Sequence, residues 1–190
     1  MAKTSKMIVN EYVNQVTEKF SEIDLSNFEK LLNLLSEKRA AGKSVFIAGN
    51  GGSASTASHF ATDIGIGGLN RTSPVKAISL CDNSAVITAS SNDNGYESVF
   101  TNQLRTLANP GDLFIAITAS GNSLNLINAI KASQLLKVSV FSLTGFDGGK
   151  VKELTEDTNL HVSTPLGSYG VVEDLHLSIC HMITECLRIE

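Results

Sequence analysis

The residues best placed to do chemistry stand in the stretch 44–63, SVFIAGNGGSASTASHFATD. The apolar run 45–48 leads into a glycine-rich segment, 49–53, and a small-residue segment then carries His59 and Asp63 four positions apart. Glycines allow positive φ and close approach of the backbone, and the unpaired N–H groups where a loop enters a helix bind anions. Residues i and i+4 share one helix face. We therefore predict a strand, an anion-binding loop and a helix that presents an imidazole and a carboxylate beyond the anion.

The glycine-rich segment does not match the common nucleotide motifs. No lysine follows its second glycine, as a Walker A motif requires, and the spacing is not a clean G-x-G-x-x-G. The expected ligand is therefore a small phosphoester rather than a nucleotide. The alternative is an ordinary tight turn between strand and helix that binds nothing.

A second segment of the same kind follows the apolar run 112–118. In residues 118–123, TASGNS, three hydroxyl side chains stand just before a helical pattern over 124–135. Hydroxyl and N–H groups at a helix start bind phosphate without a strong positive charge, although a hydroxyl-rich helix cap would look similar. Two such loops after parallel strands favour a phosphate site over two coincidental turns.

Composition narrows the class of protein. The chain has 190 residues, 42% hydrophobic and 18% charged, which fits one globular domain with one core. A net charge of −4 gives no basic patch for nucleic acid. No apolar run approaches the roughly 18 residues of a membrane span, and Asn10 and Glu11 interrupt the apolar N-terminal run, unlike in a signal peptide. We expect neither a nucleic-acid partner nor membrane insertion.

The three cysteines are scattered and odd in number, which indicates free thiols in a reducing cytoplasm. Cys180 stands beside His181, so a cysteine nucleophile must be considered. Neighbouring residues of a helix point about 100° apart, however. That geometry disfavours the pair as catalytic partners.

Helical spacing of apolar residues predicts two helices within residues 1–42, before the first strand. Ser26 and Glu29 resemble a capping box for the second, and Gly42 is a suitable stop. These helices are not needed for strand–helix–strand units, so we expect them at an oligomer interface. Further strands are predicted at 75–80, 112–118, 138–143 and 159–163, and further helices at 82–87, 99–107, 124–135 and 171–189, with a turn at 91–95.

Alternation of strands and helices predicts an α/β fold: a three-layer sandwich with a mostly parallel five-stranded sheet, preceded by the N-terminal helices and forming a single domain over 1–190. In such folds ligands bind at the carboxyl ends of the strands, near the point where the strand order reverses. Both loops, 49–53 and 118–123, follow a strand and fall at that edge.

Five segments in this order, GNGGSASTASHFATD, SSNDNGYE, ITASGNS, LTGFDGG and VVEDLHLSICH, resemble the SIS (sugar-isomerase) domain. Within it they are most similar to the phosphoheptose isomerase family, also called sedoheptulose 7-phosphate isomerases. The resemblance covers nearly the whole chain. Each motif alone is only weakly specific for the family, but the five motifs together are specific. It implies a cytoplasmic homotetramer with active sites between subunits, one zinc per subunit, and a role in supplying heptose for surface polysaccharide.

The resemblance also implies roles for individual residues. The base falls on Asp63 and the acid on His181. The zinc ligands fall on His59, Asp63, Glu173 and His181. The substrate contacts fall on Asn50, Gly51, Gly52, Ser53, Asp63, Asn92, Asp93 and Glu173, and on Thr118, Ala119, Ser120 and Ser123, which would hold the phosphate.

The resemblance implies interconversion of sedoheptulose 7-phosphate and D-glycero-D-manno-heptose 7-phosphate, and this reaction suits these side chains. Isomerisation of a ketose to an aldose moves a proton between C1 and C2 through an enediol, which needs a base for the carbon and an acid for the carbonyl oxygen. A carboxylate and an imidazole can serve near neutral pH, zinc can polarise the carbonyl, and the phosphate loops position the sugar.

The chain departs from the family pattern at two site positions. The family usually has Glu where this chain has Asp63, and Gln where it has Glu173; an arginine expected near Gly67 is absent, with Arg71 as a possible substitute. Residues eight apart on a helix rise about 12 Å and differ by roughly 80° in direction. Glu173 and His181 therefore cannot easily meet one ion from a single straight helix. Either the helix begins irregularly or some ligands come from another chain, and we expect a site completed between chains.

Two other functions remain open at this point. A close relative with the same fold is non-catalytic and binds the bacterial replication initiator, and there the position matching His181 is not histidine, so His181 favours an enzyme. An isomerase acting on a different sugar phosphate is the other alternative. His161, His176 and Asp147 are expected to be mainly structural.

Overall fold

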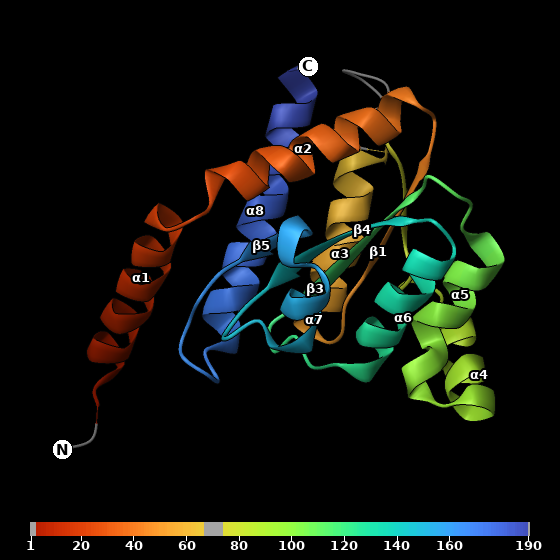
Figure 1. The fold of residues 1–190 in the computed structure, drawn as a ribbon. Helices are drawn as coiled ribbons and strands as arrows, with labels where there is room; N and C mark the ends of the chain where they lie inside the picture. Colours follow the sequence, from red (N-terminus) through yellow and green to blue (C-terminus); the bar gives the residue numbers. More distant parts are fainter. Residues whose placement is uncertain (1–2, 67–73, 190) are drawn as a thin grey trace.

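The computed structural model describes residues 3–66 and 74–189 and shows helices packed on both faces of a central sheet (Figure 1). Gly67 and Arg71 lie outside the described residues. The described strands are β1 (Ser44–Ala48), β2 (Lys76–Ser79), β3 (Leu113–Thr118), β4 (Ser139–Thr144) and β5 (Asn159–His161), in the order β2-β1-β3-β4-β5. All four strand pairs are parallel. The five predicted strands are thus confirmed, and the described sheet is entirely rather than mostly parallel.

The two faces of the sheet bury different helices. In β1, Val45 and Ile47 belong to one core cluster, whereas Phe46 and Ala48 belong to the other, because successive side chains of a strand point to opposite faces. The first cluster is covered by α2 (Leu25–Ala40), α3 (Gly52–Ile64) and α8 (Tyr169–Ile189). The second is covered by α5 (Val99–Leu107), α6 (Leu124–Leu135) and α7 (Gly149–Leu154). The predicted three layers are confirmed.

The order of the strands places both glycine-rich loops at one edge of the sheet. The chain leaves β1 through α3 toward β2 on one side, while β3 pairs with β1 on the other, with Ala48 opposite Ala116. The loops 49–53 and 119–123 therefore leave adjacent parallel strands at their carboxyl ends. This is the position at which ligands bind in such sheets.

Two local predictions were wrong. The N-cap of α2 is Asp24 rather than Ser26, because the Asp24 carboxylate accepts hydrogen bonds from the N–H groups of Ser26 (2.9 Å) and Asn27 (3.2 Å). The helix α4 (Ser84–Asn94) continues through most of the predicted turn 91–95 and ends at Gly95, whose φ of 84° a helix cannot accommodate. A short 3-10 helix, η2 (Tyr96–Ser98), then leads into α5.

The first helix, α1 (Ser5–Ser21), contacts the rest of the chain along one side only. It lies at the edge of the molecule against α8 (Figure 1), and none of its residues, all of which the structure describes, is buried. The Tyr12 hydroxyl donates a 2.6 Å hydrogen bond to the Asp174 carboxylate, which raises the pKa of Tyr12 to about 12. Large apolar side chains of α1 remain exposed: Met7, Ile8, Val9 and Val13.

None of the described helices is both long and apolar enough to cross a bilayer. The last described 3-10 helix, η3 (Glu156–Thr158), leads into β5, the edge strand of the sheet.

His176 on α8 is completely buried, and neither ring nitrogen makes a hydrogen bond with the described residues. Burial lowers its pKa from 6.5 to about 4, although the nearby backbone of Thr144 partly offsets this effect. The histidine expected to be structural is therefore a neutral core residue.

This burial predicts a pH dependence of stability. Between pH 6.5 and about 4 the unfolded chain binds a proton at His176 that the folded chain does not. The contribution of neutral His176 to the free energy of unfolding is therefore fully present above pH 6.5 and is lost as the pH falls toward 4. We expect the free energy of unfolding to fall by about 3 kcal/mol more in the wild type than in His176→Leu between pH 7 and pH 4. Denaturant unfolding at several pH values measures this difference, and parallel curves for the two proteins would contradict it.

Candidate functional site

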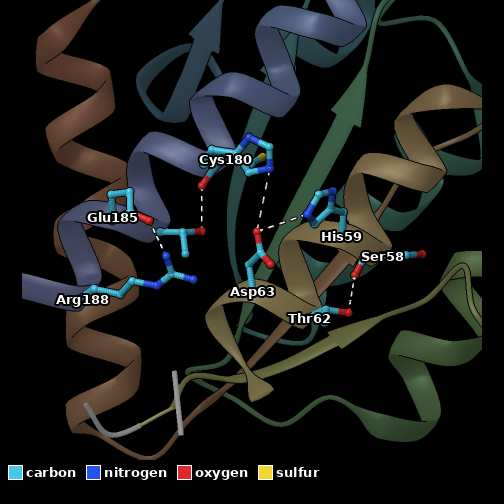
Figure 2. Close-up of polar contacts among 9 residues, drawn as sticks. Ser58, His59, Thr62, Asp63, Cys180, Glu185 and Arg188 are labelled. Atoms are coloured by element: carbon cyan, nitrogen blue, oxygen red, sulfur yellow. Dashed lines mark hydrogen bonds and ion pairs between the residues drawn. The ribbon is translucent and has the colours of Figure 1, made fainter. Parts of the chain in front are cut away.

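The candidate site is a cluster of two imidazoles around one carboxylate, formed by α3 and α8. The Asp63 Oδ2 lies 3.4 Å from His59 Nε2 and 3.9 Å from His181 Nε2. The two imidazole rings meet edge to face, with centroids 4.9 Å apart. Figure 2 shows Asp63 between His59 and α8. The structure thus brings together the predicted base and the predicted acid within one chain.

Core packing of α3 on α8 creates this cluster. The buried face of α3, with Ala57, Phe60 and Ala61, shares a core with Ile179 and Ile183 of α8. Small residues on α3 allow the two helices to approach closely. His59, Asp63 and His181 stand beside the buried seam, with the imidazole side chains each 48% exposed and the carboxylate 24% exposed. The cluster is therefore accessible to a ligand yet held by rigid elements.

Cys180, the neighbour of His181, is buried in the same core. Burial raises the pKa of its thiol, so the reactive thiolate is disfavoured. Burial thus disfavours Cys180 as a nucleophile paired with His181.

Hydrogen bonds at Ser58 fix the exposed face of α3 to the β2 edge. The Ser58 hydroxyl donates to the Asp82 carboxylate and lies 3.1 Å from the Ser79 hydroxyl. Because His59 follows directly, this contact restrains the turn of α3 that carries the imidazole.

The three side chains fit a divalent metal. Their ligand atoms all lie within 4.8 Å of one another. Among the described residues, these three are the group of His, Cys, Asp or Glu side chains close enough together to hold a metal ion. Two imidazole nitrogens and a carboxylate oxygen are a donor set of catalytic zinc sites, in which neighbouring ligands lie about 3.4 Å apart. The observed separations of 3.4 and 3.9 Å are close to that value.

Glu173 lies elsewhere in this structure. Its carboxylate covers Gly52 so closely that a Cβ at position 52 would fall 2.3 Å from it. Glu173 and His181 stand on one continuous helix, on which residues eight apart point in different directions and cannot easily reach one ion. Glu173 therefore contacts the first glycine-rich loop, and its role as a fourth metal ligand stays a prediction.

The first loop is built for close backbone approach. Gly51 caps α3 with a φ of 54° and makes no side-chain cap bond, and a Cβ at Gly49 would fall 2.5 Å from the Ser53 carbonyl oxygen. Ser53 itself is buried. The side chain of Asn50 is hydrogen-bonded to Asn125 and Tyr96. The first turn of α3 is thus left without a side-chain cap, and the Glu173 carboxylate lies against it.

The second loop is shaped by its own hydroxyl groups. The Gly121 N–H donates to Thr118 Oγ1 (3.1 Å), and the Asn122 N–H donates to Ser120 Oγ (3.3 Å). Ser123 occupies the N-cap of α6 without a side-chain cap bond among the described residues. Thr118 and Ala119 are buried. A ligand at this loop would therefore meet mainly Ser120, Ser123 and the backbone N–H groups.

Asn92 and Asp93 lie in the last turn of α4, where both are exposed and the Asn92 amide donates to the Asp93 carboxylate (2.9 Å). Their segment is joined to the first loop by the Tyr96 hydroxyl, which donates to Asn50 Oδ1 (2.7 Å). Sequence reasoning missed Tyr96 and Asn125. The available signal for Asn125 was one amide within an otherwise apolar helix start, LNLI.

Comparison with known proteins identifies the family. The family model of the SIS domain matches residues 10–145. A probable phosphoheptose isomerase of Thermoplasma acidophilum is 35% identical over 83% of this chain and 86% of its own length. The chain belongs to the phosphoheptose isomerase family of SIS-domain proteins. A phosphoheptose isomerase of Alteromonas mediterranea is similarly 34% identical over 88% of this chain and 84% of its own length.

Solved structures of the family agree. Phosphoheptose isomerase GmhA from Neisseria gonorrhoeae superposes with a TM-score of 0.83 and 29% identity, covering 94% of this chain and 93% of that one. The phosphoheptose isomerase from Francisella tularensis gives 0.87 and 25%, covering 99% and 100%. The predicted family and the SIS fold are confirmed.

In this family member the second loop is packed directly on the turn after β4. Gly121 has a φ of 67°, and a Cβ there would fall 1.9 Å from the Gly148 carbonyl oxygen. The Val151 N–H also donates to the Gly121 carbonyl (2.9 Å). Only glycine fits at this contact, which sets the position of the loop.

We expect Gly121→Ala to destabilise the fold more than Gly167→Ala. Both positions have positive φ, but a methyl group added at Gly167 would meet nothing within 4 Å. The control should lose about 1–2 kcal/mol from backbone strain alone, and Gly121→Ala about 1–3 kcal/mol more from the clash. Denaturant unfolding measures both, and equal losses would contradict the close approach.

Proposed function

We propose that this chain is an aldose–ketose isomerase that interconverts sedoheptulose 7-phosphate and D-glycero-D-manno-heptose 7-phosphate. The observation that carries the proposal is the grouping of Asp63 with His181, 3.9 Å apart, in a chain whose second loop offers hydroxyl and N–H groups to a phosphate. Further support comes from relatives named phosphoheptose isomerase that align with most of the chain.

In the proposed reaction the second loop holds the phosphate through Ser120, Ser123 and backbone N–H groups. The first loop, with Asn50, Gly51, Gly52 and Ser53, then lines the sugar. Anchoring the remote phosphate positions C1 and C2 for proton transfer, and such positioning lowers the barrier. Glu173 places negative charge at the first loop, which disfavours a phosphate there and agrees with this orientation.

Asp63 acts as the base and His181 as the acid. Both imidazoles approach the same carboxylate oxygen, Oδ2, so Oδ1 is the oxygen left to take the proton from carbon. His181 gives a proton to the carbonyl oxygen as the enediol forms and takes one back as the product forms. Asp63 is one methylene shorter than the Glu of the family, so the sugar must approach α3 more closely in this chain.

We propose that His59, Asp63 and His181 hold one zinc per subunit, with Glu173 as a further ligand only if its side chain leaves Gly52. A zinc held there would occupy the His181 nitrogen that faces Asp63, so in the zinc-loaded protein Lewis-acid polarisation of the substrate carbonyl would replace protonation by His181. The donor set and its spacing support the assignment.

We further propose a cytoplasmic homotetramer of single-domain subunits over 1–190, serving heptose synthesis for surface polysaccharide. The exposed apolar side chains Met7, Ile8, Val9 and Val13 of α1 support an interface on the N-terminal helices, since such patches mark association surfaces. The same interface would allow sites completed by a second subunit.

The direct test is conversion of sedoheptulose 7-phosphate followed by NMR. We expect heptose 7-phosphate from the wild type and a loss of about 10²–10⁴-fold in kcat for Asp63→Asn and for His181→Asn, because each removes one proton-transfer group. The control Asp157→Asn changes an exposed carboxylate on η3 that is not part of the cluster, and it should keep full activity. No conversion with or without added zinc, combined with retention of a replication initiator in a pull-down, would favour the non-catalytic alternative.

Metal content tests the zinc assignment separately. We expect one zinc per chain after dialysis of the wild type and well below one for His59→Asn and His181→Asn, measured by elemental analysis. His161→Asn changes a half-buried histidine outside the cluster and should retain the metal. Equal zinc in all four proteins would place the ion elsewhere.

A further inference from the structure

A reciprocal pair of side-chain amides joins the two glycine-rich loops. Asn50 stands in the first loop, and Asn125 lies in the first turn of α6, directly after the second loop. Asn50 Nδ2 donates to Asn125 Oδ1 (3.0 Å), and Asn125 Nδ2 donates to Asn50 Oδ1 (2.9 Å). Asn125 is only 2% exposed. The pair therefore links the carboxyl ends of β1 and β3 through a buried anchor.

The orientation of both amides is determined by their surroundings. The Leu126 N–H donates to Asn125 Oδ1 (2.9 Å), so this atom must be the oxygen. The amide nitrogen of Asn50 therefore faces it, and the amide oxygen of Asn50 faces Asn125 Nδ2. The Tyr96 hydroxyl donates to the same Asn50 oxygen (2.7 Å), which agrees with this assignment.

The Asn50 side chain has one hydrogen-bonding group left for a ligand. A carbonyl oxygen accepts two hydrogen bonds, and Asn50 Oδ1 already accepts from Asn125 and Tyr96. Its Nδ2 carries two hydrogens, of which Asn125 takes one. None of the described residues accepts a hydrogen bond from the second hydrogen of Asn50 Nδ2. Asn50 can therefore act toward a ligand only as a hydrogen-bond donor.

We propose that Asn125 and Tyr96 are positioning residues that hold the Asn50 amide as a fixed donor to an oxygen atom of the bound sugar. The inference rests on the proposed function and adds two residues to its site. In an isomerisation through an enediol, negative charge develops on sugar oxygens, and a donor oriented in advance stabilises that charge without reorganisation. A freely rotating Asn50 would present its oxygen as often as its N–H.

Tyr96 is the better position for a test because Asn125 is buried and its substitution could unfold the chain. Tyr96 is 54% exposed, and its hydroxyl contacts Asn50. Tyr169 is also 54% exposed, and its ring packs on Phe146, while its hydroxyl has no hydrogen-bond partner among the described residues. Tyr169→Phe is therefore a matched control that removes the same atom.

The experiment is a double-mutant cycle on sedoheptulose 7-phosphate, with kcat, KM and the Kd from calorimetry measured for each protein. We expect Tyr96→Phe to lower kcat/KM about tenfold, the loss of one oriented hydrogen bond, and Tyr169→Phe to change it less than about twofold. In an Asn50→Ala background Tyr96→Phe should have almost no further effect, because residues that act through one another are not additive. Circular dichroism should show both single variants folded at the assay temperature, so that a loss of activity in Tyr96→Phe does not reflect unfolding.

Two outcomes would overturn the inference while leaving the proposed function intact. One is an active wild type in which Tyr96→Phe changes nothing. The other is an equal loss from Tyr96→Phe with and without the Asn50 amide, which would show that the hydroxyl acts independently. A wild type that neither binds nor converts the sugar phosphate would instead contradict the proposed function, and the inference would fall with it.

Discussion

The packing of α3 against α8 is the contact on which the candidate site depends. Asp63 and His181 are 118 positions apart in the sequence, and they meet only because both helices bury apolar residues against the same face of the sheet. His59 adds the second imidazole from the preceding turn of α3. A small shift between these helices would separate the carboxylate from His181 without disturbing either helix. The precision of the site is thus a property of the hydrophobic core.

The parallel sheet supplies the other constraint, since it brings both glycine-rich loops to one edge. Gly121 permits contact between the second loop and the turn after β4, and the Asn50–Asn125 pair joins the second loop to the first. Glu173 then adds negative charge against Gly52. The two loops are therefore unequal: one is suited to phosphate, and the other presents an amide donor and a carboxylate to the uncharged part of a sugar.

Sequence patterns predicted most of the fold because buried strands and amphipathic helices leave local signatures. The helix at 99–107 was predicted at its observed bounds, and the pairing of His59 with Asp63 follows from helical spacing alone. The start of α2 was misplaced because Asp24 and Ser26 are both good caps, and only geometry selects between them. The Tyr96–Asn50–Asn125 hydrogen bonds and the burial of His176 depend on tertiary contacts, which no local pattern encodes.

The most direct measurement is a crystal structure of the protein with sedoheptulose 7-phosphate bound. We expect the phosphate against Ser120 and Ser123, with C1 and C2 about 3 Å from the reacting groups of Asp63 and His181. A phosphate bound at the first loop beside Glu173, or a sugar whose C1 and C2 lie far from both side chains in every subunit, would contradict it.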